Sequence, residues 1–199
     1  MSASAIAATI AERDWCVQPA YLPAGRLERL RHTLVQGWEQ GRFHQAGVGR
    51  GAAHTVRHDI RGDHVLWLEE CEAPAVRQFV VEDIERLRLA LNAAGYFGLH
   101  DFEGHFAVYP PGTGYARHFD RFRDNDARVV SLVLYLNDNW HADDGGELRL
   151  YPRATAPEPV SVLPVGGTLA VFLSADVPHE VLPARRERFS LTGWFRRRI

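Results

Sequence analysis

The fold is decided by the stretch Tyr115-Ala-Arg-His118-Phe-Asp120, in which one residue separates a histidine from a carboxylate. Successive side chains of a β-strand alternate between its two faces, so His118 and Asp120 would point the same way from a strand. A second histidine, His179, stands far downstream at the start of another predicted strand. A histidine and an aspartate at this spacing are common by chance, so the pair gains meaning only from the rest of the chain.

The composition indicates a folded globular chain. Of its 199 residues, 46% are hydrophobic and 24% are charged, and no run approaches the roughly 18 consecutive apolar residues of a membrane-spanning helix. The two cysteines, Cys16 and Cys71, exclude a disulfide framework and a cysteine-rich zinc site, and the N-terminus lacks the basic leader of a secretory signal. The net charge of −2 provides no general attraction to nucleic acid. We expect one cytoplasmic domain over residues 1–199, with neither nucleic-acid nor membrane partners.

The first half of the chain, residues 1–100, predicts supporting helices and one mobile loop. Residues 1–13 are rich in alanine, and apolar residues recur at helical spacing over residues 24–40 and 74–94. The segment 43–54 is rich in glycine and lacks periodicity, which predicts an exposed loop between two strands.

The second half, about residues 101–199, predicts a core of short strands. Clusters of Gly, Pro, Asn or Asp separate most of the apolar stretches, as is typical of strands joined by turns. The eight strand candidates are residues 102–109, 115–120, 129–136, 147–151, 160–163, 168–173, 180–182 and 189–195. Eight short strands after a helical half indicate an α+β fold, namely a double-stranded β-helix (a jelly-roll, cupin-like core) with supporting N-terminal helices.

Such a double sheet can bring His179 back beside His118 and Asp120. Two imidazoles and one carboxylate form the facial triad of non-haem Fe(II) oxygenases, which leaves coordination positions open for other ligands. The alternative for either histidine is an ordinary polar residue at the end of a strand. The other eight histidines have no such neighbours in the sequence, and we interpret them as surface or packing residues.

An arginine and two tyrosines predict an anion site beside this metal. Arg188 follows His179 by nine residues, and a guanidinium buried inside the double sheet would need an anionic partner. A dicarboxylate cosubstrate fits, with one end at the metal and the other paired with Arg188. Tyr135 would donate its hydroxyl to the far carboxylate and Tyr109 to the near one. Core packing is the alternative for both tyrosines.

Five longer motifs occur in this half of the chain: Tyr109-Pro-Pro-Gly-Thr-Gly-Tyr115, Tyr135-Leu-Asn-Asp-Asn-Trp140, Gly145-Gly-Glu-Leu-Arg-Leu-Tyr-Pro152, Pro178-His-Glu-Val181 and Arg188-Phe-Ser-Leu-Thr-Gly-Trp194. Together with Asp59-Ile-Arg-Gly-Asp63, they resemble the 2-oxoglutarate-dependent prolyl 4-hydroxylases over residues 40–199. Within that family, the chain is most similar to the hypoxia-inducible-factor prolyl hydroxylases and their bacterial relatives.

The resemblance implies a role for each residue of the metal and cosubstrate site. His118, Asp120 and His179 would bind Fe(II). Arg188 and Tyr135 would hold the C5 carboxylate of 2-oxoglutarate, while Tyr109 would contact its C1 end. Thr192 would face the pocket from the strand that carries Arg188.

The resemblance also implies the substrate side of the site. Trp194 would line the side shared by cosubstrate and substrate. Residues 47–58 would form the mobile loop that closes over the substrate. Asp63 and Arg128 would form a pair that links this loop to the entrance of the active site.

The activity that the resemblance implies is hydroxylation of a prolyl residue at C4 in a protein substrate. Fe(II), 2-oxoglutarate and O₂ would be required, succinate and CO₂ would be released, and ascorbate would stimulate turnover. The bacterial relatives are associated with the translation factor EF-Tu, which is therefore the first protein substrate to test.

Two alternatives stay open. The first is hydroxylation of a free amino acid or another small molecule. The second is a cupin-like protein that binds metal as a sensor without turnover. Nucleic-acid demethylation is disfavoured, because Trp194 and not a second arginine stands six residues after Arg188.

Overall fold

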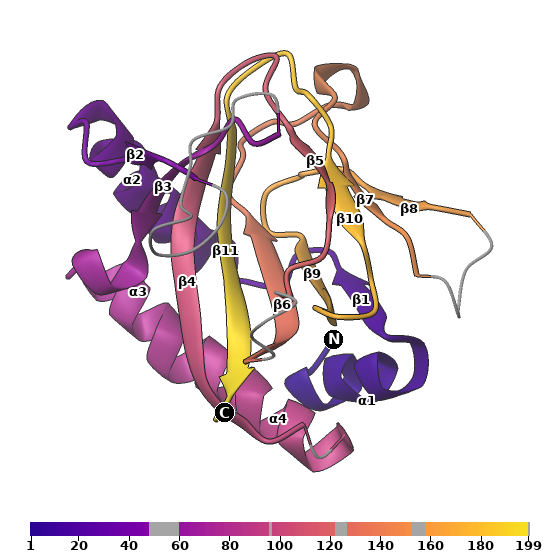
Figure 1. Ribbon diagram of the computed structural model, residues 1–199. Helices are drawn as coiled ribbons and strands as arrows, with labels where there is room; N and C mark the ends of the chain where they lie inside the picture. The colour runs from indigo at the N-terminus through magenta and orange to yellow at the C-terminus, as the bar shows by residue number, and fades with distance from the viewer. Residues whose placement is uncertain (48–59, 96, 122–126, 153–157, 199) are drawn as a thin grey trace.

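The computed structural model describes residues 1–47, 60–95, 97–121, 127–152 and 158–198 (Figure 1). The helical elements are α1 (Ala3–Arg13), α2 (Ala24–Glu39), η2 (Leu68–Glu70), α3 (Pro74–Gln78), η3 (Phe79–Ile84), α4 (Glu85–Gly95) and η4 (Ala142–Asp144). The strands are β1 (Trp15–Gln18), β2 (His44–Gln45), β3 (His64–Trp67), β4 (Leu99–Tyr109), β5 (Tyr115–His118), β6 (Arg128–Tyr135), β7 (Leu148–Leu150), β8 (Val160–Val162), β9 (Leu169–Leu173), β10 (His179–Val181) and β11 (Arg188–Arg197).

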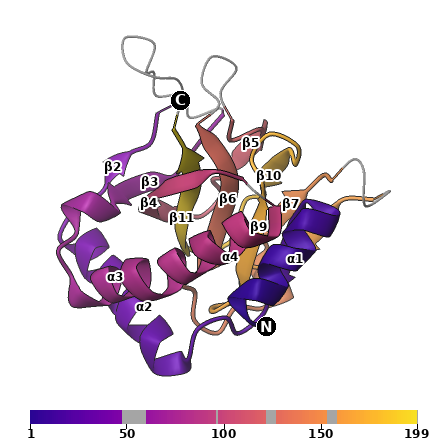
Figure 2. The ribbon, with the colours of Figure 1, turned by 90° about the horizontal axis from the view of Figure 1, so that it is seen from below.

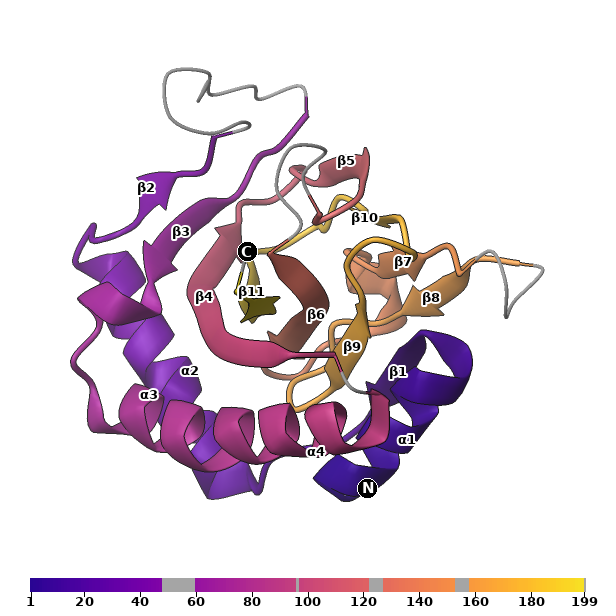
Figure 3. The ribbon, with the colours of Figure 1, turned by 60° about the horizontal axis from the view of Figure 1, so that its bottom comes forward.

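The strands form two antiparallel sheets. The larger has the order β1-β9-β6-β11-β4-β3-β2, and the smaller has the order β5-β10-β7-β8. The two sheets face each other as in a jelly roll (Figure 3), and apolar side chains from both meet in one cluster between them. The predicted double-stranded β-helix is confirmed, and the three strands β1, β2 and β3 extend it on both edges of the larger sheet.

Alternation along the strands separates a helix-covered face from a cavity face. In β6, Val130, Leu132 and Leu134 are fully buried among helix residues, whereas Val133 and Tyr135 point into the space between the sheets. Replacing such a buried leucine by alanine costs about 2–5 kcal/mol of stability. Helices α2, α3 and α4 lie along this outer face of the larger sheet, with α1 beside α4 (Figure 2). These helices therefore cover one face of the larger sheet, and its other face lines the space between the two sheets.

The predicted helix over residues 74–94 is present but contains a π-helical segment. Its three consecutive parts are α3, η3 and α4. Phe79 and Ile84 are five residues apart and both are buried, which matches the i to i+5 repeat of a π-turn. None of the helices in the described ranges is long and apolar enough to cross a membrane.

The strand boundaries differ slightly from those predicted. β4 begins at Leu99, three residues before the predicted start, and β5 ends at His118. Asp120 therefore lies just beyond the strand on which it was expected. Of the predicted mobile loop at 47–58, all but Gly47 lies outside the described residues.

Candidate active site

A cavity of about 330 Å³ lies between the two sheets. Its lining comes from β3, β4, β6 and β11 on one side and from β5, β7 and β10 on the other. His118, Asp120 and His179 reach it from the smaller sheet, and Arg188 reaches it from the larger one. Residues from distant parts of the chain thus converge on one space.

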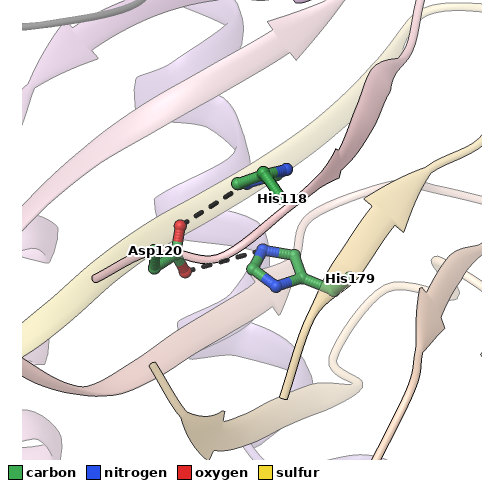
Figure 4. Close-up of side chains that lie close together, drawn as sticks. All are labelled: His118, Asp120 and His179. Atoms are coloured by element: carbon green, nitrogen blue, oxygen red, sulfur yellow. Dashed lines mark ion pairs between the residues drawn. The ribbon is translucent and has the colours of Figure 1, made fainter. Parts of the chain in front are cut away.

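His118, Asp120 and His179 lie together (Figure 4) and line this cavity, and we call this group the metal end. His118 is the register partner of His179 across the β5–β10 ladder, so the two imidazoles start from adjacent strands. Asp120 Oδ1 lies 3.6 Å from His118 Nε2, and Asp120 Oδ2 lies 3.5 Å from His179 Nε2. One donor atom from each residue falls within 4.8 Å of the other two.

Backbone carbonyls orient both imidazoles in the same way. His118 Nδ1 lies 2.7 Å from the carbonyl oxygen of Ala116, and His179 Nδ1 lies 3.2 Å from that of Val177. If each Nδ1–H donates to its carbonyl, both Nε2 atoms keep a lone pair directed at the shared centre. In each case the carbonyl belongs to the residue two positions earlier, which lies in β5 for His118 and just before β10 for His179.

The protonation states at this centre suit a metal. Burial lowers the pKa of His179 to about 4, with His118 acting in the same direction and Asp120 opposing it. Burial acts to raise the pKa of Asp120, but the imidazoles of His179 and His118 and the hydroxyl of Ser131 outweigh it and hold that pKa well below its usual range. A neutral imidazole and an ionised carboxylate are the forms that bind metal, so this donor set of two nitrogens and one oxygen fits Fe(II).

A buried cation, Arg188, lines the same cavity, and we call its surroundings the Arg188 end. Arg188 is 2% exposed, and its Nε donates to the carbonyl of Gly146 at 2.9 Å. Gly146 has a positive φ of 73°, and a Cβ there would meet Ala184 Cβ at 2.9 Å and Arg188 Cδ at 3.3 Å. The glycine is therefore required by both its conformation and the close approach of the arginine.

Two tyrosines flank this guanidinium, and neither supplies a negative charge. The Arg188 guanidinium carbon lies 5.2 Å from the centre of the Tyr109 ring and 5.0 Å from that of Tyr135. Burial raises the pKa of Tyr135 to about 12 although Arg188 lowers it, and its hydroxyl makes no hydrogen bond of ordinary geometry with the described residues. Arg188 likewise has no acidic side chain within 4 Å among those residues. A buried cation beside an unpaired hydroxyl fits a carboxylate ligand.

Comparisons with known proteins agree with this chemistry. The pattern of the 2OG-Fe(II) oxygenase superfamily matches residues 104–196. The crystal structure of a Pseudomonas putida prolyl-4-hydroxylase is 44% identical, with a TM-score of 0.88 over 99% of this chain and 100% of that one. The chain belongs to the prolyl-hydroxylase type of 2OG-Fe(II) oxygenases. It is therefore a dioxygenase, with Fe(II) as its metal and 2-oxoglutarate as its cosubstrate.

Animal relatives are similar at lower identity. A Trichoplax adhaerens prolyl hydroxylase, solved with a peptide of the hypoxia-inducible-factor oxygen degradation domain, is 27% identical, with a TM-score of 0.85 over 98% of this chain and 88% of that one. The mouse prolyl hydroxylase EGLN3 is 35% identical over 74% of this chain, and the Caenorhabditis elegans hypoxia-inducible factor prolyl hydroxylase is 30% identical over 92% of it. The oxygenase spans 63% and 27% of the lengths of these two proteins, respectively.

Asp63 and Arg128, the pair that the resemblance implies, each contact another partner in the structure, and their link to the loop at residues 47–58 stays a prediction. Asp63 accepts hydrogen bonds from Arg61 at 2.6 and 2.9 Å. Arg128 donates to Glu103 at 2.5 Å and lies 3.4 Å from the centre of the Trp194 ring. Glu103 and Trp194 are register partners across the β4–β11 ladder, so Arg128 can contact both side chains.

The sequence assigned no role in the site to four residues that the structure places near the triad or in the cavity wall. The Tyr115 ring stacks on the His118 ring with 3.6 Å between ring centres, and the Arg61 guanidinium carbon lies 5.0 Å from the centre of the Tyr115 ring. His105 is a buried packing residue as predicted, but its ring also lies in the cavity wall. Ser131 contacts Asp120, and it interrupts an otherwise apolar strand, which was a usable signal in the sequence.

Proposed function

We propose that this oxygenase hydroxylates C4 of a prolyl residue in a protein substrate. One atom of O₂ would enter the substrate as the hydroxyl oxygen, and the other would enter succinate as 2-oxoglutarate loses CO₂. When bound, the metal supplies the activation of O₂. The observation that carries the proposal is the buried Arg188 guanidinium, which has no acidic partner among the described residues and lines the cavity that the two histidines and Asp120 share.

The proposed roles at the cosubstrate follow from charge and hydrogen bonding. Arg188 would pair with the C5 carboxylate, and the Tyr135 hydroxyl would donate to the same group. Burial raises the pKa of Tyr109 well above its usual value, so a neutral phenol would donate to the C1 end. Thr192 faces the cavity from β11, where its hydroxyl would contact cosubstrate or oxygen.

The proposed substrate side has aromatic walls. Burial, with Arg61 and Arg128 acting in the same direction, lowers the pKa of His105 to about 3, so its ring is neutral. That ring lies 5.0 Å from Trp67 and 5.4 Å from Trp194 between ring centres. A pyrrolidine ring is an apolar group that suits such walls, and Arg128 stacked on Trp194 would close one side.

A polypeptide suits this cavity better than a free amino acid. Among the described residues that line it, the acidic side chains are Asp63, Glu103 and Asp120. Asp63 is paired with Arg61, Glu103 with Arg128, and Asp120 belongs to the metal centre. A free amino acid would bring an ammonium group without an available carboxylate, whereas a prolyl residue within a chain has no such charge. Asp63 would act through Arg61 at the cavity wall.

The test is a hydroxylation assay with three substrate classes. The iron-loaded protein is incubated with 2-oxoglutarate and a cell lysate, purified EF-Tu or free proline, and products are mapped by mass spectrometry. We expect prolyl residues of a polypeptide to gain one oxygen atom, with EF-Tu as the first candidate. Hydroxylation of free proline without any modified polypeptide would contradict the proposal.

Two controls make the assay decisive. The variant His118→Ala should form neither succinate nor hydroxyproline, whereas His32→Ala, at an exposed position on α2, should retain both activities. Binding of metal and 2-oxoglutarate without succinate formation from any substrate would indicate a sensor in place of an enzyme that acts on proline.

A further inference from the structure

Two buried serines lie beneath the carboxylate of Asp120. Ser131 in β6 donates from its hydroxyl to Asp120 Oδ2 at 2.6 Å. The Ser131 and Ser174 hydroxyl oxygens are 2.8 Å apart. Both serines are 0% exposed. The three side chains therefore form a continuous chain of polar groups in a region from which solvent is excluded.

The ionised carboxylate determines the direction of these hydrogen bonds. Asp120 can only accept, so the proton of Ser131 points toward it. The Ser131 oxygen must then use a lone pair toward Ser174, and the Ser174 hydroxyl is the donor. The short distance to Asp120 is typical of a hydrogen bond to a charged acceptor.

Asp120 needs such support more than the two histidines do. It lies beyond the end of β5, whereas His118 and His179 belong to paired strands with backbone carbonyls behind their rings. The nearest backbone tie is the Arg121 amide, which donates to the Ser174 carbonyl at 3.3 Å. Ser174 thus contacts the chain next to Asp120 through its backbone carbonyl, and its side chain reaches the carboxylate only by way of Ser131.

We propose that Ser174 and Ser131 form a hydroxyl relay that makes Asp120 offer the metal Oδ1 alone. With Oδ2 engaged by Ser131, the carboxylate would not chelate the metal through both oxygens. Chelation would consume a coordination position that the cosubstrate or O₂ needs. Neither serine lines the cavity, so both are positioning residues that act through Asp120. The proposal depends on the metal centre and not on the identity of the substrate.

The first test is the affinity of Ser131→Ala for Fe(II), measured by anaerobic equilibrium dialysis. Loss of an outer hydrogen-bond partner of a ligand typically weakens metal binding about 10–100-fold, and we expect a loss in this range. Ser131→Thr keeps the hydroxyl and should bind Fe(II) within about threefold of the wild type. Equal affinity of Ser131→Ala and the wild type would overturn the proposal.

The second test asks whether Ser174 acts through Ser131. Ser174→Ala should weaken Fe(II) binding by a smaller factor, about threefold to tenfold. In the Ser131→Ala background the same substitution should have no further effect, because the relay is already broken. If the loss of Fe(II) affinity in the double variant equals the product of the losses in the two single variants, the serines act independently and the relay is refuted.

A spectroscopic measurement separates positioning from a general contribution to folding. The visible absorption of the Co(II)-loaded protein reports its coordination, and it should change in Ser131→Ala but not in Ser131→Thr. The melting temperature of the metal-free variants reports folding. A lowered melting temperature with unchanged Co(II) absorption and Fe(II) affinity would assign both serines a purely structural role and would overturn the proposal. If Ser131→Ala does not fold, the Co(II) absorption, Fe(II) affinity and melting temperature are measured on Ser174→Ala and compared with those of the wild type.

Discussion

The two ends of the cavity are held in place by different means. Arg188 and its neighbours Tyr109 and Tyr135 sit on β11, β4 and β6, long strands in the middle of the larger sheet (Figure 1). His118 and His179 sit on β5 and β10, which have four and three residues and a register shift between them. Long backbone ladders fix the cation, whereas short strands need individual hydrogen bonds to fix the metal ligands.

This difference means that the ends should respond to different perturbations. The Arg188 end is defined by a positive charge on a long strand, so removing that charge should weaken the binding of 2-oxoglutarate. The metal end is defined by a few directed hydrogen bonds, so the loss of one hydrogen-bond donor or one metal ligand should lower the affinity for Fe(II). A substitution of Arg188 should leave the Fe(II) affinity, measured without cosubstrate, unchanged.

The largest expected effect is at the metal end. His179→Ala removes one of three donors, which is about 4 kcal/mol if the donors share a metal-binding free energy of roughly 10–16 kcal/mol. We expect succinate formation to fall about a thousandfold, with Fe(II) affinity lost in parallel. His32→Ala is the control. Turnover of His179→Ala within about tenfold of the wild type would contradict the predicted triad.

Arg188→Met should affect the other end. Losing the partner of a buried carboxylate costs about 2–5 kcal/mol, so the KM for 2-oxoglutarate should rise roughly a hundredfold. Fe(II) affinity should not change. The metal-free variant should melt at a higher temperature, because a buried cation without an acidic partner is removed. A parallel loss of Fe(II) affinity would show that the two ends are not separable.

A smaller effect is expected for Tyr135→Phe. It removes one hydroxyl and keeps the ring, and a hydrogen bond to a charged group contributes about 1.5–3 kcal/mol. The KM for 2-oxoglutarate should therefore rise about tenfold or somewhat more. Tyr151→Phe is a matched control, because the Tyr151 hydroxyl donates to Glu180 at 2.5 Å and not to the cavity. An unchanged KM in Tyr135→Phe would show that the Tyr135 hydroxyl does not bind the carboxylate of 2-oxoglutarate.

The smallest effect concerns His105 in the cavity wall and its contribution to the pH dependence of stability. The pKa of His105 is about 3 in the folded protein and near 6.5 when unfolded, so the unfolded chain binds more protons between these values. Stability is therefore lost as pH falls through this window, by about 1 kcal/mol from this residue between pH 6 and 5. His105→Phe should give a shallower decline. Denaturant unfolding of the metal-free proteins would measure it, and identical slopes would contradict the prediction.

The parts of the fold that could be predicted from sequence are those set by local periodicity. Short apolar stretches between clusters of turn residues indicated the strands β6 and β11, and helical spacing indicated α2 and the run from α3 to α4. The strand β2 has only two residues, and no pattern of that length predicts a strand. Asp120 was placed on β5 because alternation continues through it, but ladder pairing stops at His118.

By itself, the sequence determined which side chains share a strand face and which motifs recur together, because both depend on neighbours along the chain. That was enough to predict the jelly roll and to select His118, Asp120, His179 and Arg188 as candidates. Only the tertiary structure decided which polar groups meet across strands. Ser131 is 11 residues from Asp120 and 43 from Ser174, and strand register brings the three together. Register is a property of whole sheets, so the support beneath Asp120 appears only when the sheets are assembled.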